Sequence, residues 1–295
     1  MKNREEILAN LNPAQLEAVQ TIKGPLLVVA GAGSGKTKAL THRIAFLIAN
    51  GISPHEILAV TFTNKAAGEM KNRIRGMLGA ESALPTIGTF HSVCVQILRR
   101  EIHQLGRENN FLIYDTTDQK LLMKKIFREK NIEEKEFNPG AILSAISGAK
   151  SRLVGAEKFV GGSRFGDLVA ELYPIYEKKL AEANALDFDD LLLKVVELFE
   201  KHPEILEKYQ EKWHFISVDE YQDTNLAQAK ITNSLAEKYR NLCVIGDPDQ
   251  SIYSWRGADI SNIRDFKKNY PEAKIVKLEQ NYRSTTTILE AANAV

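Results

Sequence analysis

The sequence predicts an α/β fold in which a parallel sheet is covered by helices on both faces. Five short apolar runs, rich in β-branched residues, each lead into a polar or glycine-rich turn, and helix-like stretches follow several of them. Continuous apolar strands that alternate with helices indicate a parallel sheet buried on both sides. The expected strands are residues 26–30, 57–62, 215–218, 242–246 and 275–278, with 86–90 as a weaker sixth.

Between about residue 107 and residue 187 this alternation of strands and helices stops. The segment has helical patterns at 117–130, 139–150 and 165–183, and Gly161 and Gly162 break it. We therefore expect an all-helical insertion that interrupts the α/β domain.

Composition and charge are those of an ordinary globular chain. With 295 residues, 44% of them hydrophobic, the chain is long enough for two packed units. Its 39 basic and 38 acidic residues leave a net charge of +1, so any nucleic-acid surface must be a local patch. The two cysteines, Cys94 and Cys243, lie far apart without metal-ligand spacing, which fits a reducing cytoplasm.

The ends of the sequence predict a cytoplasmic location and a longer parent protein. The first ten residues are polar and lack the apolar core of a secretory signal. No apolar run approaches the ~20 residues that span a bilayer, so we expect no membrane contact. The sequence stops inside a predicted helix that begins near Ser284, and we therefore expect a fragment of a larger chain.

A phosphate-binding loop is expected at residues 30–37, which read AGAGSGKT between a predicted strand and a predicted helix. Glycines let backbone N–H groups turn toward phosphate oxygens, and the helix N-terminus adds its positive end. Lys36 would meet the outer phosphates and Thr37 would offer a hydroxyl to Mg²⁺. The first position is alanine instead of the commoner glycine. The predicted nucleotide-binding residues are Ala30, Gly31, Ala32, Gly33, Ser34, Gly35, Lys36 and Thr37.

A carboxylate pair, Asp219 and Glu220, follows the predicted strand at 215–218. Asp219 would hold Mg²⁺ through water, and Glu220 stands where a base could orient the attacking water. Alternatively, the two are solvated charges in a loop. The acids at 187, 189 and 190 could also form a metal cluster, but acids in a first helical turn complement the helix dipole, so we favour a helix start there.

Seven segments, in order, resemble the motifs of the UvrD/Rep/PcrA group of superfamily 1 DNA helicases, and the match covers essentially the whole chain. The segment at 11–15 looks like the Q motif and the segment at 61–67 like motif Ia, while 88–92 resembles motif Ib and 186–192 the LDFDDLL segment. The others resemble motifs II, III and IV, at 219–225, 246–257 and 280–284.

The resemblance implies two RecA-like domains that bind ATP and single-stranded DNA and translocate 3′→5′. It implies domain 1A at residues 1–107 and 188–280, a helical 1B insertion at 108–187, and the start of a second RecA-like domain, 2A, at 281–295. Gln15 and Tyr282 would contact adenine, Gln250 would sense the γ-phosphate, and Arg283 would be the arginine finger.

The resemblance also implies single-stranded DNA contacts, with bases against Phe62, Tyr253 and Trp255. The remaining predicted DNA-binding residues are Asn64, Lys65, Thr89, His91 and Arg256. Tyr253 and Trp255 are two apart, so an extended backbone would place them on one face, and aromatic faces stack on any base at ~1–3 kcal/mol each. Core packing is the alternative for each aromatic, Phe90 and His91 included, and Lys65 could be a solvated helix residue.

The predicted function is an ATP-dependent DNA helicase of repair or replication, acting on single strands and single-strand/duplex junctions. Because an arginine finger completes a site only when two domains close, we expect this chain alone to hydrolyse ATP weakly. The alternatives are the motor of a helicase–nuclease and a nucleotide-dependent switch that binds DNA without unwinding it. A kinase or GTPase is disfavoured, because the chain lacks an Asn-Lys-X-Asp guanine signature.

Overall fold

The computed structural model describes residues 3–254 and 257–293. Contacts within the chain group it into two compact units. The first, called the sheet unit below, comprises Met1–Phe90, Glu207–Thr224 and Thr232–Val295. The second, called the helical unit, comprises His91–Leu206 and Asn225–Ile231. The predicted domain boundaries after residues 107, 187 and 280 rest on the pattern of predicted strands and helices, while the domain names come from the family resemblance, and all of them remain predictions.

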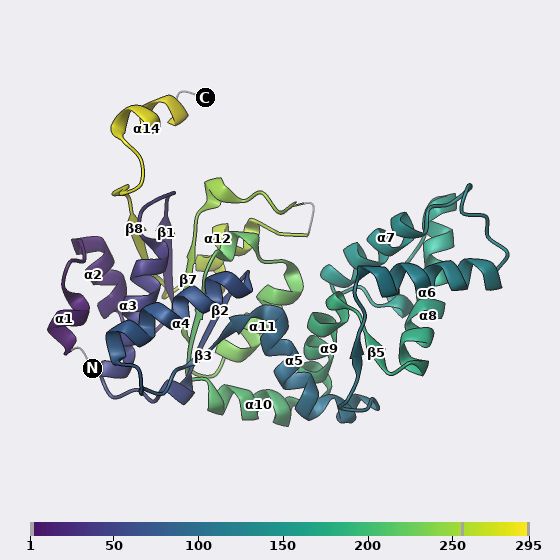
Figure 1. Ribbon diagram of the computed structural model, residues 1–295, viewed down its shortest axis with the longest axis horizontal. Helices are drawn as coiled ribbons and strands as arrows, with labels where there is room; N and C mark the ends of the chain where they lie inside the picture. The colour runs from purple at the N-terminus through teal and green to yellow at the C-terminus, as the bar shows by residue number, and fades with distance from the viewer. Residues whose placement is uncertain (1–2, 255–256, 294–295) are drawn as a thin grey trace. The chain divides into compact units, whose positions relative to one another are not determined.

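The sheet unit is built on six parallel strands in the order β3-β2-β6-β7-β1-β8 (Figure 1). The strands β2 and β6 are buried along their whole length, as two-sided cover requires. The predicted parallel α/β sheet is therefore confirmed, including its weaker sixth strand. The bounds are β1 Leu26–Ala30, β2 Ile57–Thr61, β3 Thr86–Thr89, β6 Phe215–Val218, β7 Asn241–Gly246 and β8 Lys274–Leu278.

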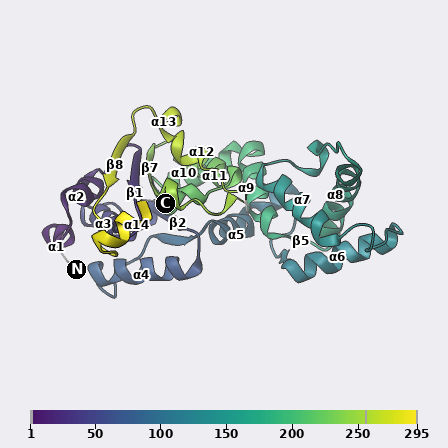
Figure 2. The ribbon, with the colours of Figure 1, turned by 90° about the horizontal axis from the view of Figure 1, so that it is seen from above.

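Helices cover both faces of this sheet. Figure 2 shows α3 and α4 on one side of the strands and α12 and α13 on the other. On the first side, α3 and α4 pack against the strands in a large apolar cluster that includes Leu40, Met70 and Val28. On the second side the ring of Phe266 meets that of Tyr221, with centroids 6.1 Å apart. The helices are α1 Arg4–Leu8, α2 Pro13–Gln20, α3 Lys36–Ala49, α4 Asn64–Leu78, α12 Ser261–Arg264, α13 Phe266–Asn269 and α14 Thr286–Asn293.

The helical unit packs its helices around a separate core that includes Phe127, Ile142, Leu172 and Tyr176. Its helices are α5 Phe90–Glu101, α6 Thr116–Glu129, α7 Pro139–Ser151, α8 Arg164–Glu182 and α9 Phe188–Lys201. The helices α10 Pro203–Lys212 and α11 Leu226–Ala236 have residues in both units. The three helices predicted in the insertion lie within one residue of α6, α7 and α8.

The expectation of an all-helical insertion is wrong in one detail. The strands β4 Leu112–Ile113 and β5 Ala185–Leu186 pair in parallel and join the two ends of the segment. Each strand has only two residues, which is too short for the period-two pattern that identifies a strand in a sequence. In the part of the chain that the structure describes, no helix is long and apolar enough to cross a membrane.

Candidate nucleotide-binding site

Three loops of the sheet unit begin at the carboxyl ends of the adjacent strands β6, β7 and β1. The phosphate loop follows β1, the Asp219–Glu220 pair follows β6, and Asp247 follows β7. Parallel strands end at the same edge of a sheet, where open α/β folds bind their ligands. The topology therefore brings residues far apart in the sequence to one edge of the sheet.

The phosphate loop has the backbone geometry that its glycines predict. Gly33 and Gly35 have φ values of 70° and 86°, in the left-handed region that favours glycine. Gly35 is the N-cap of the 14-residue helix α3, and no side chain caps the first N–H groups of that helix. These backbone donors, together with the helix dipole, form an anion site. Thr37 is the second residue of the same helix.

Lys36 lies between two of the predicted catalytic side chains. Its Nζ is 3.3 Å from Glu220 Oε2 and donates a 3.3 Å hydrogen bond to Gln250 Oε1. The structure thus brings Lys36, Glu220 and Gln250 together, from the ends of three strands. Both contacts are long for a charged donor, whose hydrogen bonds are ordinarily about 2.7–2.9 Å.

The carboxylates near Lys36 crowd one another. Burial, together with the charge of Glu220, raises the pKa of Asp219 to about 7. The same two causes raise the pKa of Asp223 to about 6, and Asp223 Oδ1 is buried without a hydrogen-bond partner. A divalent cation would relieve this concentration of negative charge. Oxygen donors suit Mg²⁺, so the residues present fit that ion.

The predicted adenine-contacting residues Gln15 and Tyr282, from near the two ends of the sequence, both form hydrogen bonds with the phosphate loop. Gln15 is buried, and its Nε2 donates to the carbonyl of Ser34 at 3.0 Å. Asn12 Nδ2 donates to the hydroxyl of Tyr282 at 2.8 Å, and the Tyr282 backbone N–H donates to the carbonyl of Gly33 at 2.9 Å. Tyr282 as a whole residue is 57% exposed, which leaves it accessible to a planar base.

Asn281 is a residue of this site that the sequence analysis did not single out. Its Nδ2 donates to the carbonyl of Ala32 at 2.6 Å, and its Oδ1 accepts the backbone N–H groups of Arg283 and Ser284. A Cβ on Gly33 would lie 2.6 Å from Arg283 Cβ. The segment after β8 is therefore seated on the phosphate loop by hydrogen bonds that no local sequence pattern indicates.

The predicted DNA-binding residues fall into two groups. In the sheet unit, Phe62 and Tyr253 are half-buried, while Asn64 and Lys65 are exposed at the start of α4. Phe62 stands edge-on to Phe90 at 6.3 Å, and Phe90 is buried, as the core-packing alternative for it predicted. Thr89 ends β3 and is buried.

His91 belongs to the helical unit. It lies 5.8 Å from the ring of Phe188, which is half exposed and which the sequence analysis did not consider. Burial lowers the pKa of His91, so its ring is mostly neutral at neutral pH. The predictions for Trp255 and Arg256 lie outside the described residues.

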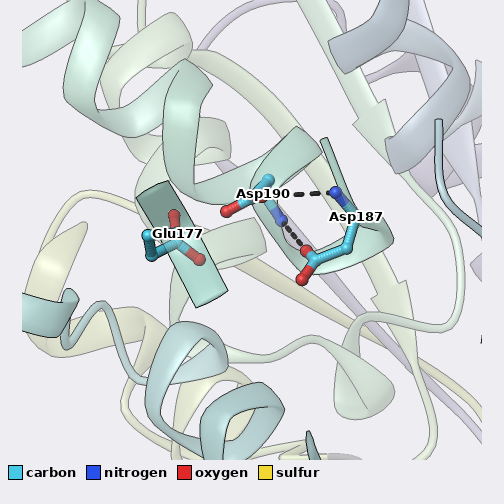
Figure 3. Close-up of side chains that lie close together, drawn as sticks. All are labelled: Glu177, Asp187 and Asp190. Atoms are coloured by element: carbon cyan, nitrogen blue, oxygen red, sulfur yellow. Dashed lines mark hydrogen bonds between the residues drawn. The ribbon is translucent and has the colours of Figure 1, made fainter. Parts of the chain in front are cut away.

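The acids at 187–190 begin a helix, as the favoured interpretation predicted, and two of them also form ion pairs with Lys150. Asp187 is the N-cap of α9 and forms a capping box with Asp190. Figure 3 shows these two carboxylates together with that of Glu177, which comes from α8. The Nζ of Lys150 lies within 2.6–2.8 Å of all three, so an ammonium occupies the place that a metal ion would need.

The sheet and its loops define a phosphate-loop nucleoside-triphosphatase domain: β1, a glycine-rich turn and α3, with a buried carboxylate at the end of β6. The comparisons with known proteins make this class specific. The chain belongs to the UvrD/REP helicase N-terminal domain family, whose sequence profile matches residues 11–271.

Three relatives illustrate the similarity. The chain is 54% identical over 293 residues to the ATP-dependent DNA helicase PcrA of Bacillus subtilis strain 168, and 52% identical over 293 residues to that of Staphylococcus aureus strain Mu50. It is 52% identical over 292 residues to the PcrA of Staphylococcus epidermidis. Each match covers 98% of this chain, and the chain spans 40% of the length of each relative.

Proposed function

We propose that this chain is the ATP-binding part of an ATP-dependent DNA helicase that moves along single-stranded DNA. The observation that carries the proposal is the position of Lys36, 3.3 Å from both Glu220 and Gln250 at the start of α3. A phosphate group at the loop offers Lys36 a stronger partner than either of its present ones. Glu220 is then free to accept a proton from an attacking water, while Gln250 turns its amide to the γ-phosphate.

In this proposal Mg²⁺ is held by the Thr37 hydroxyl and, through water, by Asp219. Bound there, the ion would neutralise charge on the phosphates. The chain's own contribution is orientation. Gly33 and Gly35 aim backbone N–H groups at the phosphates, and Asp219 is fixed by a 3.1 Å hydrogen bond from the Glu220 N–H to its Oδ1. Gln15 and Tyr282 would hold the adenine.

The single-stranded DNA site is proposed from residues that follow β2, β3 and β7. Phe62 and Tyr253 supply rings for base stacking, with Trp255 added from the sequence. Asn64, Lys65 and Arg256 would contact phosphates, and Thr89 and His91 remain proposed contacts of the same kind. We also propose that Arg283 acts on the γ-phosphate with a second RecA-like domain, and that the protein works in the cytoplasm at single-strand/duplex junctions in repair or replication.

The test is Lys36→Ala in the complete natural polypeptide that contains these residues. We expect ATP hydrolysis stimulated by oligo(dT) to fall by at least about 10²-fold, the scale of removing one preorganised electrostatic group. The matched control is Lys267→Ala, which removes an exposed lysine of α13 in the same unit and should leave turnover unchanged. Equal hydrolysis by wild type and Lys36→Ala would contradict the proposal.

The DNA part is tested by Trp255→Ala. Loss of a stacking ring should weaken oligo(dT) binding by ~1–3 kcal/mol, or about 5- to 150-fold in Kd, at an unchanged thermal unfolding midpoint. Unchanged affinity with a lowered midpoint would support core packing of Trp255 instead. Oligo(dT) binding without any hydrolysis in the wild type would favour the nucleotide-dependent switch.

A further inference from the structure

Five polar residues of the sheet unit, including the proposed catalytic groups, form a closed ring of contacts through their side chains and one backbone N–H. Lys36 Nζ contacts Glu220 Oε2 at 3.3 Å, and that same oxygen accepts a 2.9 Å hydrogen bond from Gln222 Nε2. Gln222 Oε1 accepts the backbone N–H of Asp247 at 2.9 Å. Asp247 Oδ2 accepts a short hydrogen bond from Gln250 Nε2, and Gln250 Oε1 accepts from Lys36 at 3.3 Å.

Gln222 is the member of this ring for which the proposed function has no role. Its side chain is 1% exposed, so it cannot reach a substrate directly. Its Nε2 donates to the carboxylates of Glu220 and Asp223, at 2.9 and 3.3 Å, while its Oε1 faces a backbone N–H. The carboxylates need a hydrogen-bond donor and the Asp247 N–H needs an acceptor, so the Gln222 amide satisfies all of them only with its Nε2 toward the carboxylates and its Oε1 toward the N–H. This position therefore needs a side chain that carries both a donor and an acceptor.

The backbone of the same short segment also holds both ends of the loop that follows β7. Near the start of that loop, the Ser251 hydroxyl donates to the carbonyl of Gln222 at 3.4 Å. At its far end, the carbonyl of Thr224 accepts the Asp259 N–H at 3.0 Å and Asn262 Nδ2 at 2.9 Å. Gln250 directly precedes the first anchor, and Tyr253 lies between the two. The positions of Gln250 and Tyr253 are therefore tied to the residues that directly follow Glu220.

We propose that Gln222 is a positioning residue that couples the orientation of Glu220 to the loop carrying Gln250 and Tyr253. When Glu220 shifts to engage an attacking water, the Gln222 amide can follow it and displace the Asp247 N–H, or it can stay and lose its hydrogen bond to Glu220. Losing a buried hydrogen bond is costly, so we expect Glu220, Gln222 and Asp247 to move together. The coupling works in both directions, so a base stacked on Tyr253 biases the position of Glu220. This inference rests on the proposed function.

The test is Gln222→Met, which keeps the approximate length and volume of the side chain and removes both hydrogen bonds. We expect kcat with oligo(dT) present to fall by about 10- to 100-fold, because small misplacements of a catalytic group cost up to about 10²-fold. The KM for ATP should change little, since no phosphate contact is lost. The ratio of oligo(dT)-stimulated to basal turnover should fall as well, which a loss of stability alone does not cause.

The matched control is Gln210→Met, which makes the same chemical change elsewhere in the sheet unit. Gln210 is also buried, and its Nε2 donates to the carbonyl of Ser234 at 2.7 Å. It lies in α10, away from the ring of contacts. We expect Gln210→Met to lower the thermal midpoint to a similar degree as Gln222→Met and to leave the stimulation ratio unchanged.

Gly246→Ala perturbs Gln222 without altering it. A Cβ on Gly246 would lie 2.7 Å from Gln222 Oε1 and 2.7 Å from Ile263 Cδ1, and both are ends of flexible side chains. The backbone of Gly246 does not have a positive φ, so alanine is not strained there for that reason. We expect the added methyl to displace the Gln222 amide and to lower the stimulation ratio in the same direction as Gln222→Met.

The possible outcomes separate this inference from the proposed function. If Lys36→Ala abolishes turnover but Gln222→Met keeps the wild-type kcat and stimulation ratio, the coupling is wrong and the function stands. If Gln222→Met raises only the KM for ATP, or lowers the ratio no more than Gln210→Met does, Gln222 is structural and the coupling is again wrong. A wild type without DNA-stimulated hydrolysis overturns both.

Discussion

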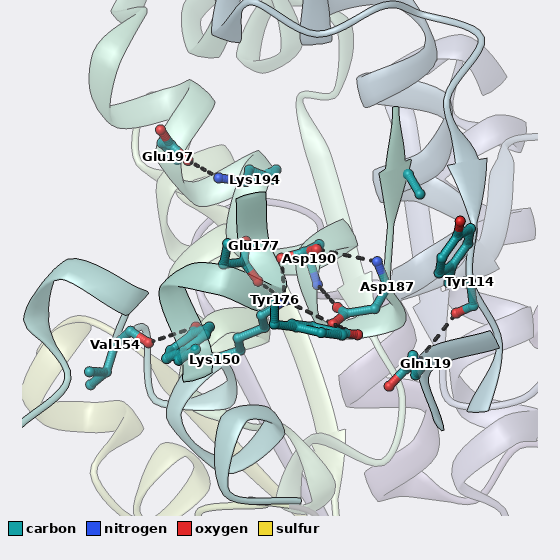
Figure 4. A network of polar contacts seen from close by, with 12 residues as sticks. Tyr114, Gln119, Lys150, Val154, Tyr176, Glu177, Asp187, Asp190, Lys194 and Glu197 are labelled. Atoms are coloured by element: carbon teal, nitrogen blue, oxygen red, sulfur yellow. Dashed lines mark hydrogen bonds and ion pairs between the residues drawn. The ribbon is translucent and has the colours of Figure 1, made fainter. Parts of the chain in front are cut away.

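Two lysines, one in each unit, stand among carboxylates in this protein, and they are held very differently. Lys36, beside the phosphate loop, lies 3.3 Å from one carboxylate oxygen of Glu220, and these side chains are 10% and 35% exposed. Lys150, in the helical unit, is fully buried and lies 2.6–2.8 Å from Glu177, Asp187 and Asp190 (Figure 4). The residue types are alike, but Lys150 donates hydrogen bonds of 2.7–2.8 Å to Asp190 and Asp187, whereas both contacts of Lys36 are 3.3 Å long.

The Lys150 cluster is held by short contacts within the protein, although Glu177 Oε1 has an ion pair with Lys150 and no hydrogen-bond partner. Asp187 Oδ2 also accepts the Tyr176 hydroxyl at 3.1 Å, while its other oxygen caps α9. Burial acts to lower the pKa of Lys150, but the charges of Asp190, Asp187 and Glu177 outweigh it and raise the pKa well above its usual value. The cluster connects α7, α8 and the start of α9, segments far apart in the sequence. It therefore links these segments, and the Lys150 ammonium lies among the three carboxylates, where a cation would otherwise bind.

The Lys36 site differs from this cluster in the length of its contacts and in its exposure to solvent. The two sites share other features, since each contains a buried carboxylate oxygen without a hydrogen-bond partner and two carboxyl groups whose pKa values are raised, first by burial. In the proposed function, a phosphate would shorten the contacts of Lys36 and a cation would offset the charge of the carboxylates. A lysine among acids therefore indicates function when its contacts are long and reach solvent, and structure when they are short and the lysine is fully buried.

The largest effect is expected for Glu220→Gln, which removes the proposed base and keeps the shape of the side chain. The kcat for ATP should fall by about 10²- to 10⁴-fold, the usual contribution of a general base. Binding of a fluorescent ATP analogue and the thermal midpoint should change little, because the side chain is partly exposed. Normal turnover in this variant would mean that Glu220 is not the base.

Lys150→Met should break the other cluster without touching the phosphate loop. Removing one partner of a buried ion cluster leaves uncompensated charge and costs about 3–5 kcal/mol of unfolding free energy. Urea unfolding, followed by circular dichroism, measures this directly. A loss of unfolding free energy below about 1 kcal/mol would mean that Lys150 contributes no more than an exposed lysine, and that burial does not distinguish it from Lys36.

The loss of unfolding free energy caused by Lys150→Met, called the deficit below, should also depend on pH. Burial raises the pKa values of Glu177 and Asp190, and the loss of the ammonium raises both further. A carboxyl with a raised folded pKa stabilises the protein below its unfolded pKa, near 4, and that contribution is lost as the pH rises through the folded pKa.

The deficit should therefore be larger at about pH 8 than at about pH 5. It should grow by ~1.4 kcal/mol per pH unit for each proton that the folded state retains. Urea titrations of wild type and Lys150→Met at both pH values give the difference. A deficit that is the same at the two pH values would show that these carboxyls stay ionised without Lys150.

The smallest effect is expected for Lys238→Met, the exposed counterpart of the same substitution. Lys238 pairs with Glu207 and Glu211 at 2.7 and 2.5 Å, distances as short as those of the buried cluster. Solvent screens these pairs, so the thermal midpoint should not change measurably. A clear drop would show that distance, and not burial, decides the worth of an ion pair here.

The sequence was most informative where a pattern is local. The phosphate loop is a contiguous run of eight residues, and the strand that precedes it and the helix that follows both lie where they were predicted. The helix start at Asp187 was also predictable, because a capping box spans only four residues. The pair β4–β5 was not, because each strand is two residues long and its partner lies more than 70 residues away.

By itself, the sequence determined the parallel α/β sheet, the phosphate loop, the carboxylate pair and the family, since each depends on neighbouring residues or on ordered motifs. Only the tertiary structure decided which side chains meet. Gln222 bridges Glu220 to the loop after β7, Asn281 seats the segment after β8 on Ala32, and Lys150 occupies the centre of an acidic cluster. Such pairings depend on strand order and side-chain direction, because parallel strands bring distant residues to one edge of a sheet.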